Sequence, residues 1–405
     1  MKGNAINNAA NSEGSAPHAG AWVRTWGASP QAPDNSVSRI DPFEDATLRQ
    51  IVRITGGGHR IRIRVSNEYG TTPLTIGAAR VALTDTGDTL RHGSGHAVTF
   101  SGRSTATVPV GAPILSDPVD LRTAALSRLT ISLYLPGRVD TATCHGTFHT
   151  LGWLIPGDAT ALTSPPVDAD ALPAQALITA VEVQSEAPSR AIAVIGDSRV
   201  DGMGSTPGTD RRWTDGLAER LAARGGQALC VVNQGISGNR MLNDGIGTAA
   251  LARFDRDILA TPGLAHVVIA VGNDLVLSFA PRTEETAGFL SMFPGAPVGV
   301  DDVIAAHLQL VARARAHGVK VHAATIAPYG SSELYSAEGD KAREQVNTWI
   351  RTSDAFDGVL DFDAVWRDPA DSTHIRSDLH MGDHLHGNDA GYAALAESID
   401  LSLFT

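Results

Sequence analysis

The sequence predicts an α/β fold with a three-layer, flavodoxin-like parallel sheet, preceded by an antiparallel β-sandwich of the jelly-roll kind. Up to about residue 187, short runs of alternating apolar and polar residues are separated by Gly, Pro, Asn or Asp turns, which is typical of half-buried antiparallel strands. From residue 191 onward, continuous apolar runs alternate with stretches whose apolar residues recur every three or four positions, which predicts strands and helices around a parallel sheet. A chain of 405 residues is also long enough for two domains.

The first domain is expected to span residues 21–187. Its strands are predicted at 48–54, 59–67, 74–83, 97–100, 105–110, 129–135 and 177–183. In the clearest of them, Arg60, Arg62 and Arg64 fall on one face and aliphatic residues on the other. We interpret this arginine face as a solvated sheet surface or as the interface with the second domain, with a ligand surface as the alternative. Residues 156–174 lack periodicity and are expected to form a loop or linker.

The second domain is expected to span residues 188–405. Its five parallel strands are predicted at 191–195, 229–232, 266–271, 319–326 and 359–362. Its helices are predicted at 213–223, 248–259, 301–316, 341–352 and 389–403. Ligands bind at the carboxyl edge of such a sheet, because side chains and free backbone N–H groups of several strand ends converge there. Polar residues that directly follow these strands are therefore the candidates for a functional site.

Composition and charge exclude several classes of function. A net charge of −12 argues against nucleic acid as a partner, because phosphate binding requires clustered Lys and Arg. The sequence contains no run of 18 apolar residues, so no transmembrane segment is expected. Cys144 and Cys230 are too few for a disulfide framework, and we expect both to be structural thiols. The composition does not indicate an oligomeric state.

Residues 1–20 are rich in Asn, Ala, Gly and Ser and contain no apolar core of the kind that a signal peptide needs. We expect them to form a flexible leader. As written, the sequence predicts a cytoplasmic protein, although a secreted protein whose signal had been removed would show the same pattern.

Four polar blocks follow apolar runs of the second domain: Gly196-Asp197-Ser198, 233–238, Gly272-Asn273-Asp274 and 383–386. A tight turn after the apolar run 191–195 is expected to place Ser198 at the carboxyl edge of the sheet, although Ser198 could be only a helix cap. Acyl transfer to water requires a nucleophile, a base that takes its proton, a group that orients the base and donors for the oxyanion. Ser198 is the candidate nucleophile and His386 the candidate base. Asp383, three residues before His386, is close enough to orient its second ring nitrogen.

The four blocks in this order, from about residue 191 to residue 404, resemble the SGNH (GDSL) hydrolase family. The resemblance implies that the family's Asp-x-x-His block corresponds to Asp383 and His386. It also implies three oxyanion donors, namely the backbone N–H groups of Ser198 and Gly235 and the side-chain amide of Asn273. A glycine lets the backbone approach a ligand closely, and an asparagine offers an uncharged donor at a strand end. This chemistry requires neither a metal nor an organic cofactor.

Further residues are expected to support the site. Backbone amides are expected to hold Asp197 and so fix the serine loop, and Asp274 and Asn239 are candidates for supporting contacts. His384 is expected to line the pocket. A metal cluster is the alternative for His380, His384, Asp378 and Asp383, but this Gly-, Asp- and Ser-rich segment does not read as a helix that would present ligands on one face.

The sequence departs from the family pattern at two positions. Arg199 follows the serine, and we expect it either to point to solvent or to recognise a substrate carboxylate. Val271-Gly272 precede Asn273 where the family commonly has Gly-x, which puts the position of Asn273 in doubt. The long connection 275–300 contains Phe279 and Phe289 and is expected to wall the acyl pocket, with a core patch under the loop as the alternative.

The sequence therefore predicts a serine esterase that hydrolyses carboxylic esters of small molecules, acylated carbohydrates among them, through a Ser-His-Asp triad and a covalent acyl-enzyme. Short acyl chains are favoured because no lipid-binding surface is visible. One alternative is an acyltransferase of the same fold with a sugar or lipid acceptor, and another is a non-catalytic carbohydrate-binding protein. The first domain, with residues 22–26 and 65–68, is similar to the β-rich N-terminal module of one branch of bacterial SGNH hydrolases.

Overall fold

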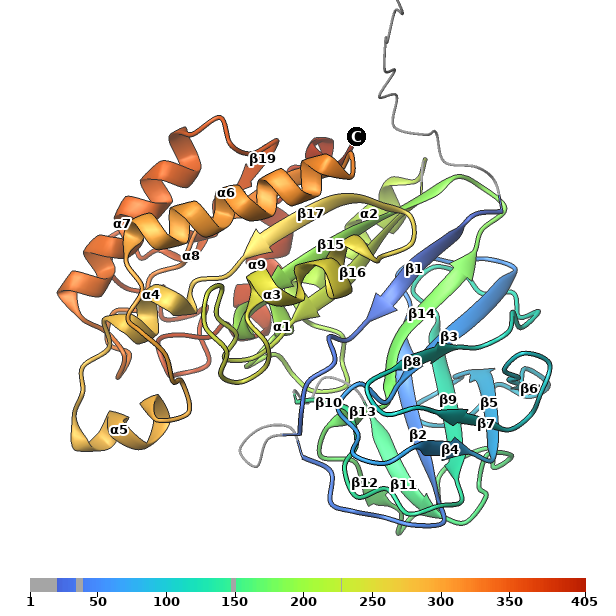
Figure 1. Cartoon of the computed structure of the whole chain (residues 1–405). Helices are drawn as coiled ribbons and strands as arrows, with labels where there is room; N and C mark the ends of the chain where they lie inside the picture. The colour runs from blue at the N-terminus through green and yellow to red at the C-terminus, as the bar shows by residue number, and fades with distance from the viewer. Residues whose placement is uncertain (1–19, 34–38, 147–150, 227) are drawn as a thin grey trace, which may run out of the picture.

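The computed structural model describes residues 20–33, 39–146, 151–226 and 228–405 of the chain. They form a β-rich domain followed by an α/β domain, which Figure 1 shows side by side. The predicted fold class is confirmed, because the first part contains only antiparallel sheets and the second a five-stranded parallel sheet. Residues 1–19, most of the predicted leader, lie outside the described residues.

The first domain contains two antiparallel sheets. One has the strand order β1 (Trp22–Gly27), β14 (Ile178–Gln184), β3 (Arg60–Ser66), β8 (Pro113–Leu115). The other has the order β12 (Asp170–Ala171), β11 (Gly152–Pro156), β2 (Ala46–Arg53), β9 (Arg128–Leu135), β5 (Ala78–Leu83), β6 (His96–Ala97). Two short ribbons complete the domain, namely β4 (Leu74–Ile76) with β7 (Ala106–Val108), and β10 (Cys144–His145) with β13 (Gln175–Ala176).

Strand β3 shows how the alternating pattern forms this core. Ile61, Ile63 and Val65 are at most 1% exposed and belong to one apolar cluster that joins residues of both sheets. Burying each of these side chains contributes about 1.5–3 kcal/mol. The predicted strand 74–83 is interrupted at Gly77, where a β-carbon would lie 2.8 Å from the ring of Tyr134.

The arginine face of β3 is linked to the second domain through Glu182 and Arg24. Arg62 donates to Glu182 on the neighbouring strand β14 at 2.6 Å. Glu182 also accepts a hydrogen bond from Arg24 of β1 at 3.3 Å, and Arg24 in turn donates to the backbone carbonyl of Ala260 and to Thr261 in the second domain. One carboxylate thus pairs with two arginines, and Arg24 carries this pairing to a boundary where an unpaired buried charge would be costly.

The parallel sheet of the second domain has the strand order 2-1-3-4-5 of a flavodoxin-like fold. The strands are β16 (Ala228–Gly235), β15 (Ser189–Gly196), β17 (Leu264–Ala270), β18 (Lys320–Ala324) and β19 (Gly358–Leu360). Successive residues of the central strand β15 face opposite layers: Ile192 and Val194 join one apolar cluster, and Ala193 and Ile195 join another. All four are fully buried, which explains the continuous apolar run in the sequence.

Helices cover both faces of this sheet. They are α1 (Ser198–Asp201), α2 (Trp213–Arg224), α3 (Ala250–Phe254), α4 (Asn273–Ser278), α5 (Glu284–Leu290), α6 (Val300–Ala316), α7 (Ala337–Thr352), α8 (Phe362–Trp366) and α9 (Asp389–Ser398). The predicted helix 248–259 has two parts: α3 is α-helical as far as Phe254, and the chain then continues as a π-helical turn from Asp255 to Leu259. The predicted connection 275–300 contains most of α4 and the whole of α5, which capping residue Thr283 begins.

The two domains share apolar contacts rather than meeting only through a linker. Cys230 and Val232 of the edge strand β16 belong to the apolar cluster of the sandwich, and β1 lies alongside β16 in Figure 1. Cys144 and Cys230 are both buried and unbridged, and burial raises the pKa of each thiol to about 12. The boundary near residue 187 therefore marks a change of sequence pattern and of sheet type, while packing continues across it.

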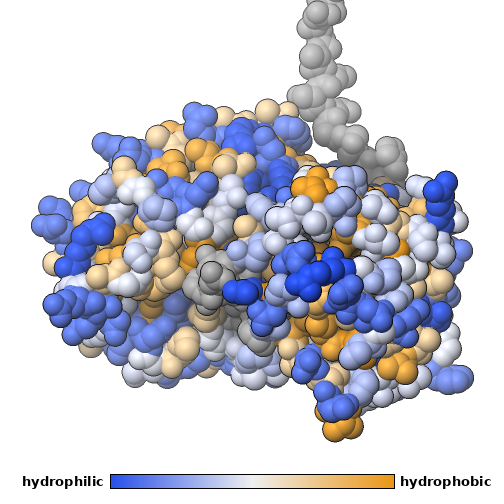
Figure 2. Space-filling view, turned by 60° about the horizontal axis from the view of Figure 1, so that its bottom comes forward, coloured by the Kyte–Doolittle hydropathy of each residue, from blue (hydrophilic) through white to orange (hydrophobic). Residues whose placement is uncertain are grey.

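The surface of the described residues alternates between hydrophilic and hydrophobic areas. Figure 2 shows this mixture on one face of the molecule. None of the described helices combines the length and the apolar character that crossing a membrane requires.

Candidate active site

The turn between β15 and α1 holds Ser198 at the carboxyl edge of the sheet. Ser198 is the first residue of α1, and it is 6% exposed. Asp197, the N-cap of this helix, accepts hydrogen bonds from the backbone N–H groups of Arg199 at 3.1 Å and Gly272 at 2.9 Å. These contacts tie the end of β15 to the residues after β17, and they are of the kind expected for Asp197.

Ser198, His386 and Asp383 form one hydrogen-bonded series. Ser198 Oγ lies 2.8 Å from His386 Nε2, and His386 Nδ1 lies 2.6 Å from Asp383 Oδ2. Because a carboxylate accepts but cannot donate, the proton of the neutral ring is held on Nδ1, and Nε2 is left to accept the serine proton. This arrangement can remove a proton from the serine hydroxyl while the carboxylate stabilises the resulting imidazolium.

The loop that carries Asp383 and His386 is fixed by its own backbone. Asp383 Oδ1 accepts the N–H groups of Leu385 at 3.0 Å and His386 at 2.9 Å. Partial burial would raise the pKa of Asp383, but the hydrogen bond and charge of His386, together with these two amides, hold the pKa well below its usual range. Asn388 caps the following helix α9 by accepting the N–H of Gly391 at 2.9 Å, as the sequence predicts.

Two of the three expected oxyanion donors follow strands of the parallel sheet. The N–H of Ser198, in the first turn of α1, has no carbonyl acceptor within its own helix. Asn273 is the first residue of α4, shortly after β17 ends at Ala270, and is partly exposed. The departure at Val271-Gly272 therefore leaves Asn273 at the carboxyl edge of the sheet.

Gly235 has a different role from the one expected. Its N–H donates to Asn233 Oδ1 at 2.9 Å, so this amide is already engaged. A β-carbon at this position would lie 2.4 Å from the backbone nitrogen of Asp201, so only glycine lets α1 pack against β16. The partly exposed Gly238, three residues later with φ +77°, is a candidate donor in the same turn that the sequence analysis missed.

Asp274 and Asn239 hold the loop that follows this turn. Asp274 Oδ1 accepts the N–H of Leu242 at 3.1 Å, and burial raises the pKa of Asp274. Asn239 donates to the carbonyl of Thr248 at 2.9 Å and accepts from Arg253 at 3.1 Å. Both side chains thus make supporting contacts within the protein.

A cavity of about 400 Å³ adjoins the histidine loop. Its lining combines aromatic, aliphatic, hydroxyl and charged side chains: Thr286, Phe289, Ser331, Ser332, Glu333, Leu334 and 382–386. Phe289 and His384 therefore line the cavity beside His386, and Phe289 is 41% exposed. Phe279 instead packs against the apolar cluster of Leu275 and Val298, so the two aromatic residues expected at the pocket have different positions.

His384 lies beside His380. Its ring packs against that of His380, with 4.4 Å between the ring centroids. Across the described ranges, no group of three or more His, Cys, Asp and Glu side chains is arranged to hold a metal ion.

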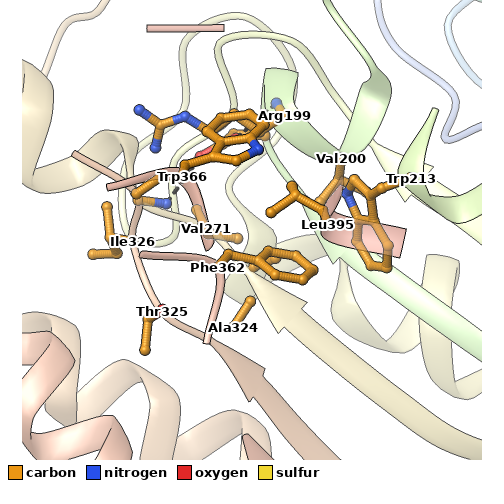
Figure 3. Close-up of a pocket in the computed structure, with 14 residues that line it drawn as sticks. Arg199, Val200, Trp213, Val271, Ala324, Thr325, Ile326, Phe362, Trp366 and Leu395 are labelled. Atoms are coloured by element: carbon orange, nitrogen blue, oxygen red, sulfur yellow. Dashed lines mark hydrogen bonds between the residues drawn. The ribbon is translucent and has the colours of Figure 1, made fainter. Parts of the chain in front are cut away.

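Arg199 is half-buried and contacts the protein's own backbone. Its Nε donates to the carbonyl of Leu385 at 3.1 Å, one residue before His386. Together with Trp213 and Trp366 it also lines a cavity of about 30 Å³ beneath the serine turn (Figure 3). Arg199 therefore links helix α1 to the loop that carries His386, a contact that neither sequence-based interpretation included.

The sequence analysis also missed a contact between the sandwich and helix α1. His145 Nε2 lies 3.1 Å from Asp201 Oδ1, and Asp201 is the last residue of α1. Asp201 Oδ2 accepts both the N–H and the hydroxyl of Ser237, at 2.9 and 2.8 Å. No sequence pattern joins His145 to Asp201, because the two residues are 56 positions apart and in different domains.

A serine, a histidine and an aspartate joined by hydrogen bonds at the carboxyl edge of a flavodoxin-like sheet form an arrangement that can carry out acyl transfer. Residues 194–394 match the model of the GDSL-like Lipase/Acylhydrolase family. This part of the chain is therefore a GDSL-type hydrolase domain, and the protein is a carboxylic ester hydrolase. No protein of curated function matches the chain.

The solved structures to which the chain is similar cover about half of it. One is a protein assigned to the G-D-S-L lipolytic family from Desulfitobacterium hafniense, with 22% identity over 52% of this chain and 97% of that chain and a TM-score of 0.37. Another is an acetylxylan esterase from Geobacillus stearothermophilus, with 20% identity over 52% of this chain and 91% of that chain and a TM-score of 0.39. The class rests on the family match, not on these distant likenesses.

Proposed function

We propose that the protein is a serine esterase in which Ser198 is the nucleophile, His386 the general base and Asp383 the group that orients the base. The observation that supports this proposal is the series of two short hydrogen bonds, 2.8 Å from Ser198 to His386 and 2.6 Å from His386 to Asp383. A general base at such a distance contributes about 10²- to 10⁴-fold in rate.

In this proposal Ser198 Oγ attacks the ester carbonyl carbon and its proton passes to His386 Nε2. The N–H of Ser198 and the amide of Asn273 donate to the oxyanion, and the N–H of Gly238 replaces that of Gly235 as the third donor. The alcohol leaves with the proton from His386, and an acyl group remains on Ser198. Water then attacks the acyl-enzyme with His386 as base, which releases the acid and restores the serine. Losing one oxyanion donor, as in Asn273→Ala, typically costs about 10²- to 10³-fold in kcat.

The substrates in this proposal are small-molecule esters with short acyl chains. The cavity beside His386 is lined by Phe289 together with hydroxyl groups and Glu333, so it can accommodate a polar alcohol moiety next to an aromatic ring. The division into a sandwich at 21–187 and a hydrolase domain at 188–405 is part of the same proposal.

The test is hydrolysis of p-nitrophenyl esters from acetate to long acyl chains, comparing the unmodified protein with Ser198→Ala. We expect kcat on the short esters to fall by about 10³-fold or more in this variant. Ser331→Ala is a matched control, because Ser331 also lies in the cavity lining and also contacts a histidine, with 2.8 Å between Oγ and His374 Nε2. If Ser331→Ala lost all activity while Ser198→Ala kept it, the proposed assignment of Ser198 as the nucleophile would be wrong.

If the folded, unmodified protein is inert on every ester, the hydrolase proposal fails. Transfer of the acyl group to an added sugar or lipid acceptor would then identify an acyltransferase. Binding of carbohydrate without any turnover would instead identify a non-catalytic protein.

A further inference from the structure

The β-sandwich reaches the nucleophile helix through one buried histidine. His145 lies in β10 of the sandwich and is 9% exposed, and its partner Asp201 is 2% exposed. The ring bridges two acceptors, with Nδ1 2.9 Å from the carbonyl oxygen of Ser29 and Nε2 3.1 Å from Asp201 Oδ1. The bridge therefore runs from the backbone after β1 through the imidazole to the last residue of α1.

The chemistry of these two partners determines the protonation of the ring. A carbonyl oxygen accepts only, and so does a carboxylate. Both ring nitrogens must therefore carry a proton, which makes His145 an imidazolium paired with an anionic Asp201. Burial opposes this charge, but Asp201 and the carbonyl of Ser29 outweigh it and raise the pKa of His145.

Other charged groups near this pair already have partners. Arg212 pairs with Asp215 at 2.7 Å, and Arg253 pairs with Asp257 at 3.1 Å. The nearby positive charge of Arg212 lowers the pKa of His145, without reversing the effect of Asp201. His145 is thus the cation that contacts Asp201 from the sandwich.

A second contact joins the sandwich to the end of the nucleophile strand. The fully buried Arg253 donates to Ser29 Oγ at 2.8 Å and to the carbonyl of Gly196 at 3.3 Å, two residues before Ser198. Ser29 Oγ also lies 2.6 Å from Gln234 Oε1 on strand β16. The sandwich residues Ser29 and His145 therefore contact the groups that hold both sides of the Ser198 turn.

Helix α1 is held mainly by contacts with neighbouring segments, through Asp197, Arg199 and Asp201. It is four residues long, so most of its backbone groups have no partner inside the helix. Its first residue must hold Oγ at hydrogen-bond distance from His386, and a misplacement of about 1 Å can cost on the order of 10²-fold in rate. The contacts of Asp201 at the other end of the helix therefore bear directly on the position of Ser198.

We propose that the sandwich completes the active site, with His145 as a positioning residue that holds the nucleophile helix through Asp201. The sandwich is then a working part of the esterase and not an independent carbohydrate-binding module. This inference rests on the proposed function, because it requires Ser198 to be the nucleophile.

The test compares His145→Gln with Tyr69→Phe in the full chain. Tyr69 is the matched control, because its hydroxyl also bonds across the domain interface, to Thr248 at 3.1 Å and Arg256 at 3.0 Å, and neither partner belongs to α1. With p-nitrophenyl acetate we expect His145→Gln to lower kcat by about 10- to 100-fold with KM nearly unchanged. Tyr69→Phe should keep kcat within about threefold of the unmodified protein. This should hold even if its thermal midpoint falls by as many degrees as that of His145→Gln.

Equal kcat values in the two variants, whether both normal or both reduced, would overturn the positioning role. The same assay on Ser198→Ala separates this failure from failure of the proposed function, since a fully active Ser198→Ala removes the basis of both. If His145→Gln does not fold, Asp201→Asn replaces it, because it keeps the side-chain size and removes only the anion.

A measurement without turnover tests the charge itself. In ¹⁵N-histidine NMR of the unmodified protein at pH 7, both ring nitrogens of His145 should show protonated shifts, with the signal assigned by its loss in His145→Gln. A neutral ring would contradict the ion pair and with it the inference.

Discussion

Two histidine–aspartate pairs contact the two ends of the same short helix, and they differ in what surrounds them. At Ser198, His386 and Asp383 have side chains that are 16% and 38% exposed. At Asp201, the side chains of His145 and Asp201 are 11% and 2% exposed. His386 Nε2 faces a hydroxyl, which can donate, whereas both nitrogens of His145 face acceptors.

The comparison teaches that neighbouring groups, more than the residue pair itself, decide what a histidine does. A histidine that faces a hydroxyl can gain and lose a proton during turnover, as a general base must. A histidine between a carbonyl and a carboxylate keeps its second proton and acts as a fixed cation. Burial strengthens that role. Removing one partner of a buried ion pair destabilises the fold strongly, because the other charge is left unpaired in a low-dielectric interior.

The largest expected difference between the pairs comes from neutralising each aspartate. We expect Asp383→Asn to lower kcat by about 10³- to 10⁴-fold with little change in the thermal midpoint, because an amide favours the wrong ring tautomer of His386. Asp201→Asn should lower kcat by at most about 10²-fold but reduce the thermal midpoint more. Kinetics on p-nitrophenyl acetate and thermal melts of both variants measure this, and a reversed order would refute the division of roles.

Gly235→Ala tests the packing of α1 between the pairs. Because the new β-carbon would lie 2.4 Å from the nitrogen of Asp201, we expect a loss of about 1–3 kcal/mol in the free energy of unfolding and a parallel loss of activity. Urea unfolding measures the first effect. Gly137→Ala is the control, since nothing lies within 4 Å of its added β-carbon and its stability should hold or rise slightly. A normal stability in Gly235→Ala with activity lost would contradict a role for Gly235 that is limited to packing.

Arg199→Met removes the contact between α1 and the histidine loop on the triad side. We expect kcat on a neutral ester to fall by about tenfold, because the carbonyl of Leu385 loses its charged donor. Arg376→Met is the control, since Arg376 pairs with Asp378 on the exposed surface of the same region and should have little effect. If Arg199→Met raises KM only for an ester that carries a carboxylate, such as p-nitrophenyl hemisuccinate, then Arg199 recognises substrate.

The smallest effect is the pH dependence of stability at the buried pair. The folded state raises the pKa of His145 above its ordinary value, so its contribution to stability is complete at low pH and is lost as pH rises through the folded pKa. The difference in thermal midpoint between the unmodified protein and His145→Gln should therefore shrink by a few degrees from pH 6 to alkaline pH. A difference that grows with pH would show that His145 is neutral in the folded state.

Local patterns predicted most of the fold. The fully apolar run at 191–195 could only be a strand buried on both faces, and the alternation at 60–65 fixed which side of β3 is buried. The predictions failed where tertiary contacts override the pattern, as at Gly77, which packs on Tyr134 and ends β4. Strand β11 was missed because its residues do not alternate, although it pairs along its whole length with β2.

The candidate site was predicted to the extent that its residues follow strands. Ser198 and Asn273 follow the apolar runs that became β15 and β17, so their shared edge could be inferred. The sequence also placed Asp383 near His386, because three residues in a turn bring them together. Gly235 was assigned a free amide because the sequence cannot show that Asn233 accepts its hydrogen bond.

The sequence by itself determined the order of strands and helices and the set of polar residues at the sheet edge, because hydrophobic periodicity and turn residues act over short distances. Only the tertiary structure decided what each polar group faces. Arg199 donates a hydrogen bond to the backbone carbonyl of Leu385 instead of pointing to solvent. His145 of the sandwich contacts Asp201 in the second domain. The protonation and role of a side chain depend on burial and on the acceptors around it, and chain folding brings these together from positions that no local pattern connects.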